Sequence, residues 1–324
     1  MPVYNIIQAV NDALRLEMRK NPRVVVLGED VGRFGGVFRA TTGLQEEFGK
    51  DRVMDTPLAE AGIIGTAIGM ALYGLRPVAE IQFADFIFPA FDQIVNELAK
   101  FRYRSGGEYP APMVIRTPYG GGIRGGHYHS QSPEALFAHT AGLKVIIPSN
   151  PYDAKGLLLT AMREEDPVMI LEPKRVYRAA RGEVPEGEYT IPFGQAKVVR
   201  EGKGLTVLCY GAMLHVVMEA LEKHGAAEFD PEVIDLRSLV PLDTETILES
   251  VRKTGRVVIV HEAQKTCGFG AELSALIAEK AVLSLEAPIA RVCGLDTPFP
   301  YTLEMEYLPS PERITKAIAD TARF

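Results

Sequence analysis

The stretch DTPLAEAGIIGTAIGMALYG, residues 55–74, is the part of the chain from which the fold class can be worked out. It opens with an acid, a threonine and a proline, and after the lone acid Glu60 it is almost wholly apolar. Gly62, Gly65, Gly69 and Gly74 interrupt the apolar run at spacings of three, four and five residues. This pattern predicts a helix with one lean face, along which another backbone can approach closely.

Glu60 stands at the predicted start of this helix and has two interpretations. Acids favour helix N-termini because the backbone dipole is positive there, so a helix-start acid is the simpler interpretation. The alternative is a catalytic carboxyl held in an apolar pocket. Residues 55–74 do not decide between the two, so the rest of the chain has to.

Length and composition indicate a protein with two globular domains. A chain of 324 residues, 47% hydrophobic and 24% charged, is long enough for two sizeable cores. The net charge of −7 argues against nucleic acid as a partner. Basic residues do gather in 100–104 and 174–181, and we expect both groups to lie on solvated faces.

The compartment is predicted from what the chain lacks. Residues 1–20 read as an amphipathic helix rather than a secretory signal, because they have neither a basic segment nor an unbroken apolar core. The longest apolar run, residues 61–75, is too short and too rich in glycine to span a bilayer. Cys209, Cys267 and Cys293 fit neither a disulfide framework nor a zinc site, so we expect three buried thiols in a cytoplasmic protein.

Short β-branched runs alternate with helical patterns, which is typical of an α/β fold with parallel sheets. In the first part of the chain the predicted strands are RVVVLGED (23–30), RPVAEIQFADF (76–86), MVIRTPY (113–119), LKVIIPSN (143–150) and DPVMILEP (166–173). Helices are predicted at 91–105, from 132 after the glycine-rich loop, and from 152. In the second part, strands are predicted at 205–210, 232–236, 256–262 and 288–294, with helices at 213–224, 243–253 and 271–280.

The segment 178–204 is rich in proline, glycine and charge, and we interpret it as the crossing between two domains. The predicted division is residues 1–185 for the first domain and 186–324 for a smaller α/β domain.

Polar and aromatic residues follow the predicted strands of the first domain. Glu29, Gln82, Phe86 and His129 each come after a strand, and Glu60 comes after the short run RVMDTPL. The carboxyl ends of parallel strands meet at one edge of a sheet, so these side chains are expected to line one crevice. An acid, an amide, an aromatic ring and an imidazole together suit a flat heterocycle.

Other motifs are weaker. The glycine loop GGGIRGG (120–126) lacks the lysine and hydroxyl of a phosphate-binding P-loop, and GFGAE (268–272) is no dinucleotide fingerprint. His127 and His129 are two residues apart and face one side of an extended segment, but no third ligand stands at a metal-site spacing.

Long stretches of the chain closely resemble the β subunits of thiamine diphosphate-dependent 2-oxo acid dehydrogenases. In the first domain the resemblance rests on GEDVG (28–32), DTPLAEAGIIGTAIGMALYGLRP (55–77), HSQSPEALFAH (129–139) and KVIIPSNPYDAKGLL (144–158). In the second domain it rests on VIDLRSLVPLD (233–243), KTGRVVIVHEA (253–263) and LEAPIARVCGLDTPFP (285–300). The resemblance implies a pyrimidine-binding α/β domain followed by a transketolase C-terminal-like domain, in an α2β2 heterotetramer.

The resemblance also implies roles for single residues, two of them catalytic. Glu60 matches the acid that hydrogen-bonds the aminopyrimidine ring nitrogen of the cofactor, and His129 matches the imidazole that moves a proton during acyl transfer to a lipoyl group. The implied cofactor contacts are Glu29, Leu58, Ala59, Glu60, Gln82 and Phe86. The implied substrate contacts are Gln82, Phe83, Ala84, Asp85, Phe86 and His129. His127 has no counterpart and is expected to be structural. A monovalent cation is implied near Met113 and Val114, with Glu164 or Asp166 beside it.

One expected motif is missing. Thiamine enzymes hold magnesium and diphosphate with a GDG…N element, and no Gly-Asp-Gly occurs in this chain. We therefore expect half a site: this chain would bind the pyrimidine, while an α subunit would hold the diphosphate and most of the magnesium shell.

The stretch IQFADFIFPAFDQIVNE (81–97) resembles branched-chain enzymes more than pyruvate enzymes. The predicted function is oxidative decarboxylation of 3-methyl-2-oxobutanoate and its homologues, with the acyl group passed to the lipoyl groups of an acyltransferase core. Pyruvate is the alternative substrate. Two other classes remain open: a non-catalytic assembly subunit that docks the acyltransferase, and a self-sufficient thiamine enzyme, against which the missing motif argues.

Overall fold

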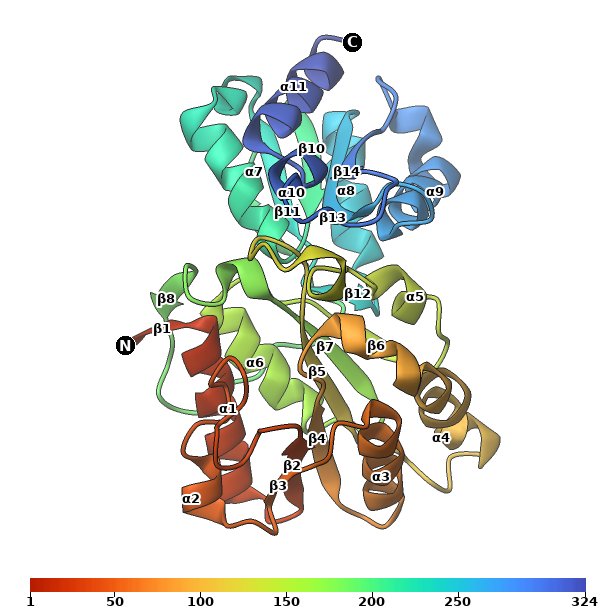
Figure 1. Cartoon of the computed structure of the whole chain (residues 1–324). Helices are drawn as coiled ribbons and strands as arrows, with labels where there is room; N and C mark the ends of the chain where they lie inside the picture. Colours follow the sequence, from red (N-terminus) through yellow and green to blue (C-terminus); the bar gives the residue numbers. More distant parts are fainter.

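Two parallel-rich sheets organise the chain in the computed structural model, which describes all 324 residues. The larger sheet lies in the lower half of Figure 1 and the smaller one in the upper half, with helices on both faces of each. This is the α/β class that the alternating pattern predicts.

The larger sheet has seven strands in the order β12-β6-β7-β5-β4-β2-β3. Neighbouring strands are parallel except for the pair β12–β6, which is antiparallel. The strands are β2 (Val24–Gly28), β3 (Val53–Asp55), β4 (Arg76–Glu80), β5 (Val114–Tyr119), β6 (Lys144–Ile146), β7 (Val168–Pro173) and β12 (Ser238–Val240).

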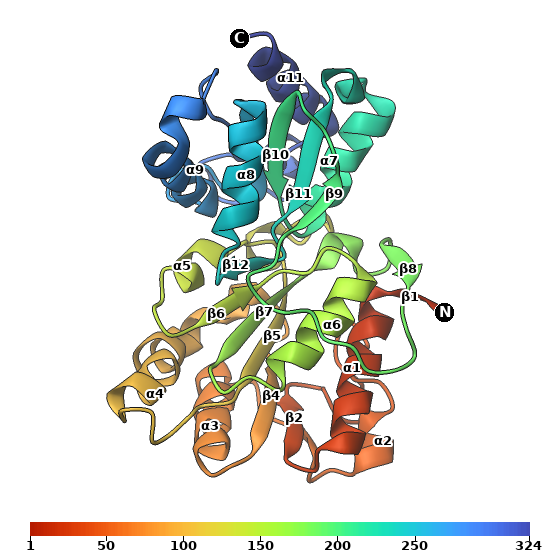
Figure 2. The ribbon, with the colours of Figure 1, turned by 180° about the vertical axis from the view of Figure 1, so that it is seen from behind.

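Helices cover both faces of this sheet, which explains why β2, β4, β5 and β7 are buried along their whole length. Val24 and Val26 of β2 belong to the cluster under α1 (Ile6–Lys20) and α6 (Pro151–Ala161), whereas Leu27 belongs to the cluster under α3 (Glu60–Leu72). Figures 1 and 2 show α1 and α6 on one side of the strands and α3 on the other.

The helix predicted at 91–105 is only partly correct. The segment is helical, but it divides into a π-helical turn η3 (Gln93–Glu97), a 3₁₀ turn η4 (Leu98–Lys100) and α4 (Phe101–Arg104). The inward residues Ile94 and Leu98 are fully buried, as the pattern predicts.

The smaller sheet has five strands in the order β14-β13-β10-β11-β9, all parallel except β9. Its strands are β9 (Lys197–Arg200), β10 (Leu205–Cys209), β11 (Pro231–Asp235), β13 (Val257–Gln264) and β14 (Ala290–Gly294). Its main helices are α7 (Ala212–Lys223), α8 (Thr244–Thr254), α9 (Phe269–Ala281) and α11 (Pro311–Ala322). The first three match the predicted helices closely, and α11 lies beyond the predicted elements.

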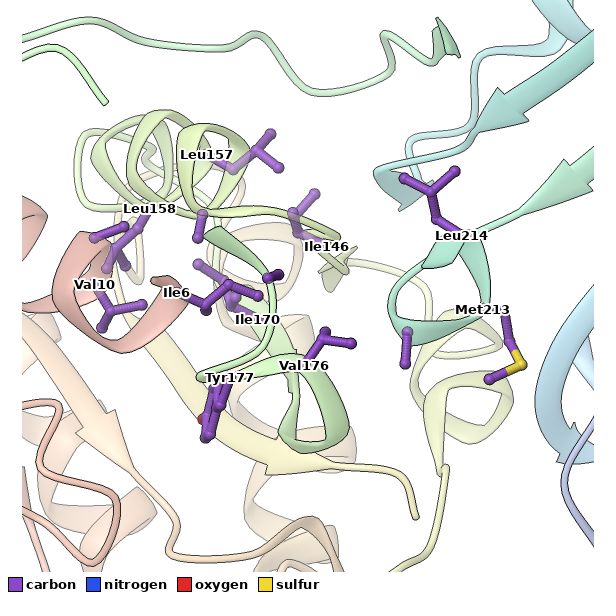
Figure 3. Close-up of a cluster of buried hydrophobic side chains, with 14 of the residues drawn as sticks. Ile6, Val10, Ile146, Leu157, Leu158, Ile170, Val176, Tyr177, Met213 and Leu214 are labelled. Atoms are coloured by element: carbon purple, nitrogen blue, oxygen red, sulfur yellow. The ribbon is translucent and has the colours of Figure 1, made fainter. Parts of the chain in front are cut away.

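The apolar interior is continuous across the junction of the two sheets. Each of the two large hydrophobic clusters, of 45 and 38 buried residues, draws side chains from both sheets. Figure 3 shows part of the larger cluster, in which Val10 of α1 lies near Leu158 of α6, and Met213 and Leu214 come from the start of α7. In addition, β12 belongs to the second part of the chain but lies in the larger sheet, where it pairs with β6. The domain division at residue 185 stays a prediction.

Two expectations about exposure were wrong. Cys267 is exposed, because it lies in the turn between β13 and α9 with a positive φ of 56°, whereas Cys209 and Cys293 are buried as expected. In the basic segment 174–181, Lys174 is only 4% exposed rather than solvated. It directly follows β7, a strand buried on both faces, so its side chain starts inside the protein.

None of the helices combines the length and the apolar character needed to cross a lipid bilayer.

Candidate active site

Four adjacent strands of the larger sheet carry the candidate site at their carboxyl ends. The strands β5, β4, β2 and β3 lie side by side and parallel, with Gly28 in register with both Asp55 and Glu80. The segments that leave these ends hold Glu29, Glu60, Gln82 and His129, so the sheet topology brings their backbones to one edge.

Glu60 is the first residue of α3 and is only 9% exposed. Its partner at this edge is Glu29, which directly follows β2. Burial, and after it the charges of Asp30 and Glu60, raises the pKa of Glu29 above its ordinary value. The two carboxyl groups are therefore close enough for the charge of Glu60 to act on Glu29.

The approach to Glu60 is open. Leu58 is 73% exposed, and Ala59, the residue that caps α3, is exposed as well. On the helix itself Gly62 and Gly69 face outward, and a Cβ added at Gly69 would meet no atom within 4 Å. The glycine face is thus exposed at Gly62 and Gly69, whereas Gly65 is half-buried beside Gln93.

A cluster of aromatic rings lies at the same edge of the sheet, in the segments that follow β4 and β5. The rings of Phe83 and His129 are perpendicular, with centroids 4.5 Å apart, and Phe86 lies edge-on to both at 5.7 Å from Phe83 and 5.3 Å from His129. The ring of Phe38 lies edge-on to that of Phe83, with centroids 5.4 Å apart. Edge-to-face contacts of this kind hold rings in defined orientations. The predicted residues Phe83, Phe86 and His129 are therefore in direct contact.

Asp85 fixes the loop that carries the imidazole. It lies in the 3₁₀ turn η1 (Ala84–Phe86), and its Oδ1 accepts hydrogen bonds from the backbone N–H groups of Ser130 and Gln131, both at 3.0 Å. Gly125 packs against His129, since a Cβ added at Gly125 would lie 2.5 Å from the Cβ of His129. Asp85 and Ala84 are both buried, so they support the site from within.

Gln82 and His127 occupy different positions from the aromatic cluster. The amide of Gln82 donates to Asp30 Oδ2 at 3.3 Å, which ties the end of β4 to the end of β2. His127 is exposed, and its ring packs against Tyr128 at 4.0 Å rather than against Phe83 or Phe86. The structural role expected for His127 stays a prediction.

A charged cluster that the sequence analysis missed lies within the sheet. The guanidinium of Arg116 donates two hydrogen bonds of 2.8 Å to Glu172 and a further one to Glu80, and Tyr177 donates to Glu172 at 2.5 Å. Burial works against the charge of Arg116, but Glu172 and Glu80 outweigh it and raise the pKa of Arg116. Each of Arg116, Glu172 and Glu80 is a charged residue within a mostly apolar strand, and this is the sequence feature that could have indicated the cluster.

The expected monovalent cation finds little support in the side chains. The ammonium of Lys144 pairs with Glu164 and lies 3.5 Å from Asp166, which also binds Arg102 at 2.7 Å. The carbonyl of Met113 accepts a hydrogen bond from the Val168 N–H at 2.9 Å. Both carboxylates are thus neutralised by the protein's own cations. No group of three or more His, Cys, Asp or Glu side chains gathers as a metal site.

Comparison with known proteins agrees with this geometry. The family model "Transketolase, pyrimidine binding domain" matches residues 3–180, and "Transketolase, C-terminal domain" matches residues 194–314. The 2-oxoisovalerate dehydrogenase subunit beta of Bacillus subtilis is 50% identical, with 100% of both chains covered. This chain belongs to the β-subunit family of the 2-oxo acid dehydrogenases.

Other relatives of this β subunit fall into two groups by name. The mitochondrial 2-oxoisovalerate dehydrogenase subunit beta of Dictyostelium discoideum is 56% identical over 98% of this chain and 86% of the relative. The pyruvate dehydrogenase E1 component subunit beta of Staphylococcus epidermidis is 50% identical over the full length of both. A solved structure described as a split gene transketolase, inactive beta4 tetramer, shares the fold with a TM-score of 0.79, 24% identity and 98% coverage of both chains.

Proposed function

We propose that this β subunit takes part in the oxidative decarboxylation of branched-chain 2-oxo acids such as 3-methyl-2-oxobutanoate. The observation that carries the proposal is the buried carboxyl of Glu60 at the start of α3, beside Glu29 and next to an open approach. A structural helix-start acid needs neither burial nor a second carboxyl at its side. The names of the relatives at 50–56% identity support the choice of substrate.

The residues present suit the ring half of thiamine diphosphate. A carboxyl pair can share a proton with a ring nitrogen, and aromatic rings offer a flat apolar wall. We propose that Glu29, Leu58, Ala59, Glu60, Gln82 and Phe86 contact the pyrimidine. When bound, thiamine diphosphate supplies the nucleophilic carbon and the electron sink that decarboxylation of a 2-oxo acid requires.

The chain's own residues would then do three things. Glu60 would direct its carboxyl toward the ring nitrogen, and Glu29, which follows β2 at the same edge, would order Glu60 or a water beside it. Phe83 and Phe86 exclude water from the reacting carbon. His129 accepts or donates a proton at its imidazole while the acyl group moves to the lipoyl acceptor.

The substrate contacts we propose are Gln82, Phe83, Ala84, Asp85, Phe86 and His129. A wall built from aromatic rings can accommodate a branched side chain, but extra methylene groups are worth only about 1–3 kcal/mol each in such a pocket. Overlapping activity toward pyruvate is therefore expected, at a lower kcat/KM than for the branched acid.

The remaining parts of the proposal concern partners. The chain has no Gly-Asp-Gly element, so an α subunit would hold the diphosphate and most of the magnesium shell in an α2β2 heterotetramer. A lipoyl acyltransferase core would receive the acyl group. We further propose the division into residues 1–185 and 186–324 and a cytoplasmic location. A monovalent cation near Met113, Val114, Glu164 and Asp166 would have to rely on backbone carbonyls.

The test is decarboxylation of 3-methyl-2-oxobutanoate and of pyruvate with an artificial electron acceptor, thiamine diphosphate and magnesium. It is run with this chain alone and then with its α partner. We expect activity only with the partner, and a higher kcat/KM for the branched acid. Activity from the chain alone would contradict the half-site, and a strong preference for pyruvate would contradict the substrate.

A further inference from the structure

Lys174 is a buried lysine to which the sequence analysis assigned no function. It opens the 3₁₀ turn η6 (Lys174–Val176), directly after β7, and is 4% exposed. Its Nζ has no hydrogen-bond partner within the chain. Burial lowers the pKa of the ammonium to about 8, so the group is still charged at neutral pH. A buried charge without a direct partner is costly, which suggests that it is retained for a reason.

The ammonium lies against the aromatic wall of the candidate site. Its Nζ is 5.5 Å from the centroid of the Phe83 ring, within the range of a cation–π contact. The Phe83 ring in turn meets His129 edge-on at 4.5 Å. Lys174, Phe83 and His129 therefore form a contiguous row from the interior to the half-buried imidazole.

Three carboxylates offset part of the effect of burial on the pKa of Lys174. The negative charges that raise its pKa are Asp85 first, then Glu262 and then Glu304. They come from three elements: η1 of the first domain, strand β13, and the short helix α10 (Glu304–Tyr307). Arg175, the next residue along the chain, is half-buried, and its charge lowers the pKa of Glu262 more than that of Lys174 does.

Each of these three carboxylates binds the backbone of the same loop, residues 120–131. The Gly121 N–H donates to Glu262 at 2.7 Å, and the Arg124 N–H donates to Glu304 at 3.0 Å. Asp85 accepts from the other end of the loop, as described above. The loop itself is rich in left-handed residues, including Gly120, Gly122, Arg124 and Gly126, so its conformation depends on contacts from outside.

We propose that Lys174 is a positioning residue whose ammonium is the shared counter-ion of Asp85, Glu262 and Glu304, and that it thereby holds loop 120–131 and His129 in the conformation required for acyl transfer. This inference rests on the proposed function, because the role of His129 belongs to it. Without the ammonium, these three buried carboxylates would lose a positive charge that acts on all of them, and Arg175 would remain only for Glu262. Mutual repulsion and protonation would then weaken their hydrogen bonds to the loop.

The first test uses Lys174→Met in the assembled enzyme with its α partner. We expect the lipoyl-dependent kcat to fall by roughly 10- to 100-fold, the size of effect that a misplaced catalytic group produces. Decarboxylation with an artificial acceptor and the KM for the 2-oxo acid should change far less. Hydrogen exchange of the backbone amides in loop 120–131 should accelerate, which reports on the loop without relying on activity.

The pH profile separates positioning from a general structural role. In the unmodified enzyme the lipoyl-dependent rate should decline as pH rises through about 8, because Lys174 then loses its charge. Lys174→Met should lack this decline. Glu304→Gln removes one of the three negative charges and should shift the decline to lower pH. This second variant still tests the inference if Lys174→Met does not fold.

Lys155→Met is the matched control, since Lys155 is also buried but lies on α6, where its ammonium donates to the Pro185 carbonyl at 2.5 Å and pairs with Asp12 at 2.6 Å. We expect it to lower stability without faster exchange in loop 120–131. Unchanged exchange and unchanged acyl transfer in Lys174→Met would overturn the inference. An unmodified enzyme that decarboxylates no 2-oxo acid would instead overturn the proposed function, and the exchange comparison would still decide whether Lys174 holds the loop.

Discussion

The carboxyl edges of the two sheets both carry polar residues, but these residues differ in how far they are buried. In the larger sheet the edge leads into Glu29, Gln82 and His129, all half-buried. In the smaller sheet the edge carries polar groups too, but Tyr210 and His261 there are 2% and 0% exposed. In each sheet the segments that follow parallel strands leave from the carboxyl edge. Topology alone therefore does not say which of the two sheets binds a ligand there.

The smaller sheet's edge is closed because the first domain fills it. Tyr210 donates a hydrogen bond of 2.9 Å to Glu134, and Glu262 receives the Gly121 N–H. Burial is the main cause that raises the pKa of Glu134 to about 8 and that of Asp235 to about 7. Perturbed groups at this edge hold the two domains together. A perturbed pKa therefore indicates function only where the edge remains accessible.

The largest effect is expected for Glu60→Gln, which keeps the shape of the side chain and removes its acid. Decarboxylation by the assembled enzyme should fall by about 10³-fold or more, since general acid–base groups contribute about 10²–10⁴. Thermal unfolding and assembly with the α partner should be unchanged. Glu46→Gln is the control, because Glu46 is an exposed first-turn acid of α2 (Leu44–Phe48). Retained activity in Glu60→Gln would return this residue to the helix-start interpretation.

The next effect concerns the imidazole of the open edge. We expect His129→Ala to reduce the lipoyl-dependent rate by about 10²-fold while artificial-acceptor decarboxylation persists. His127→Ala, two residues away on the exposed side of the loop, should have little effect on either rate. If His129→Ala left the activity of the whole complex unchanged, a non-catalytic assembly subunit would be the better description.

A smaller effect, on stability rather than activity, is expected at the closed edge. Tyr210→Phe leaves the buried Glu134 without its hydroxyl donor, and such a loss typically costs about 1–3 kcal/mol. Urea unfolding followed by circular dichroism would measure the change. Tyr301→Phe is the control, since Tyr301 is 65% exposed. A loss of decarboxylation in Tyr210→Phe without any loss of stability would mean that the closed edge takes part in the chemistry.

The last expected effect is a change in the pH dependence of stability in Glu134→Gln. The folded-state pKa of Glu134, about 8, lies above its ordinary value of 4.5, so the folded protein binds the proton more tightly. This group favours folding below pH 4.5 and loses that contribution as pH rises toward 8.

Between pH 6 and 7 the slope from Glu134 is at most about 1.4 kcal/mol per pH unit. The free energy of unfolding of the unmodified chain, compared with that of Glu134→Gln at several pH values, should show this slope as a difference. Parallel pH profiles of the two chains would show that Glu134 is already ionised in the fold.

Local patterns determined much of this protein before any tertiary contact was known. The helices predicted at 213–224 and 243–253 differ by about one residue from α7 (Ala212–Lys223) and α8 (Thr244–Thr254). The glycine-spaced run after Glu60 is α3, with Gly62 and Gly69 exposed. Such features follow from periodicity and capping, which depend on residues a few positions apart. The resemblance of long motifs likewise led to the family and to the missing diphosphate element.

Tertiary structure alone decided which of these groups are buried and what they face. The basic segment at 174 was expected in solvent, yet Lys174 lies beneath Phe83, among carboxylates from both domains. Likewise, the sheet of the first domain takes β12 from the second part of the chain. These facts arise from contacts between residues far apart in sequence. No local period encodes them, because burial and charge pairing are properties of the assembled surface rather than of a segment.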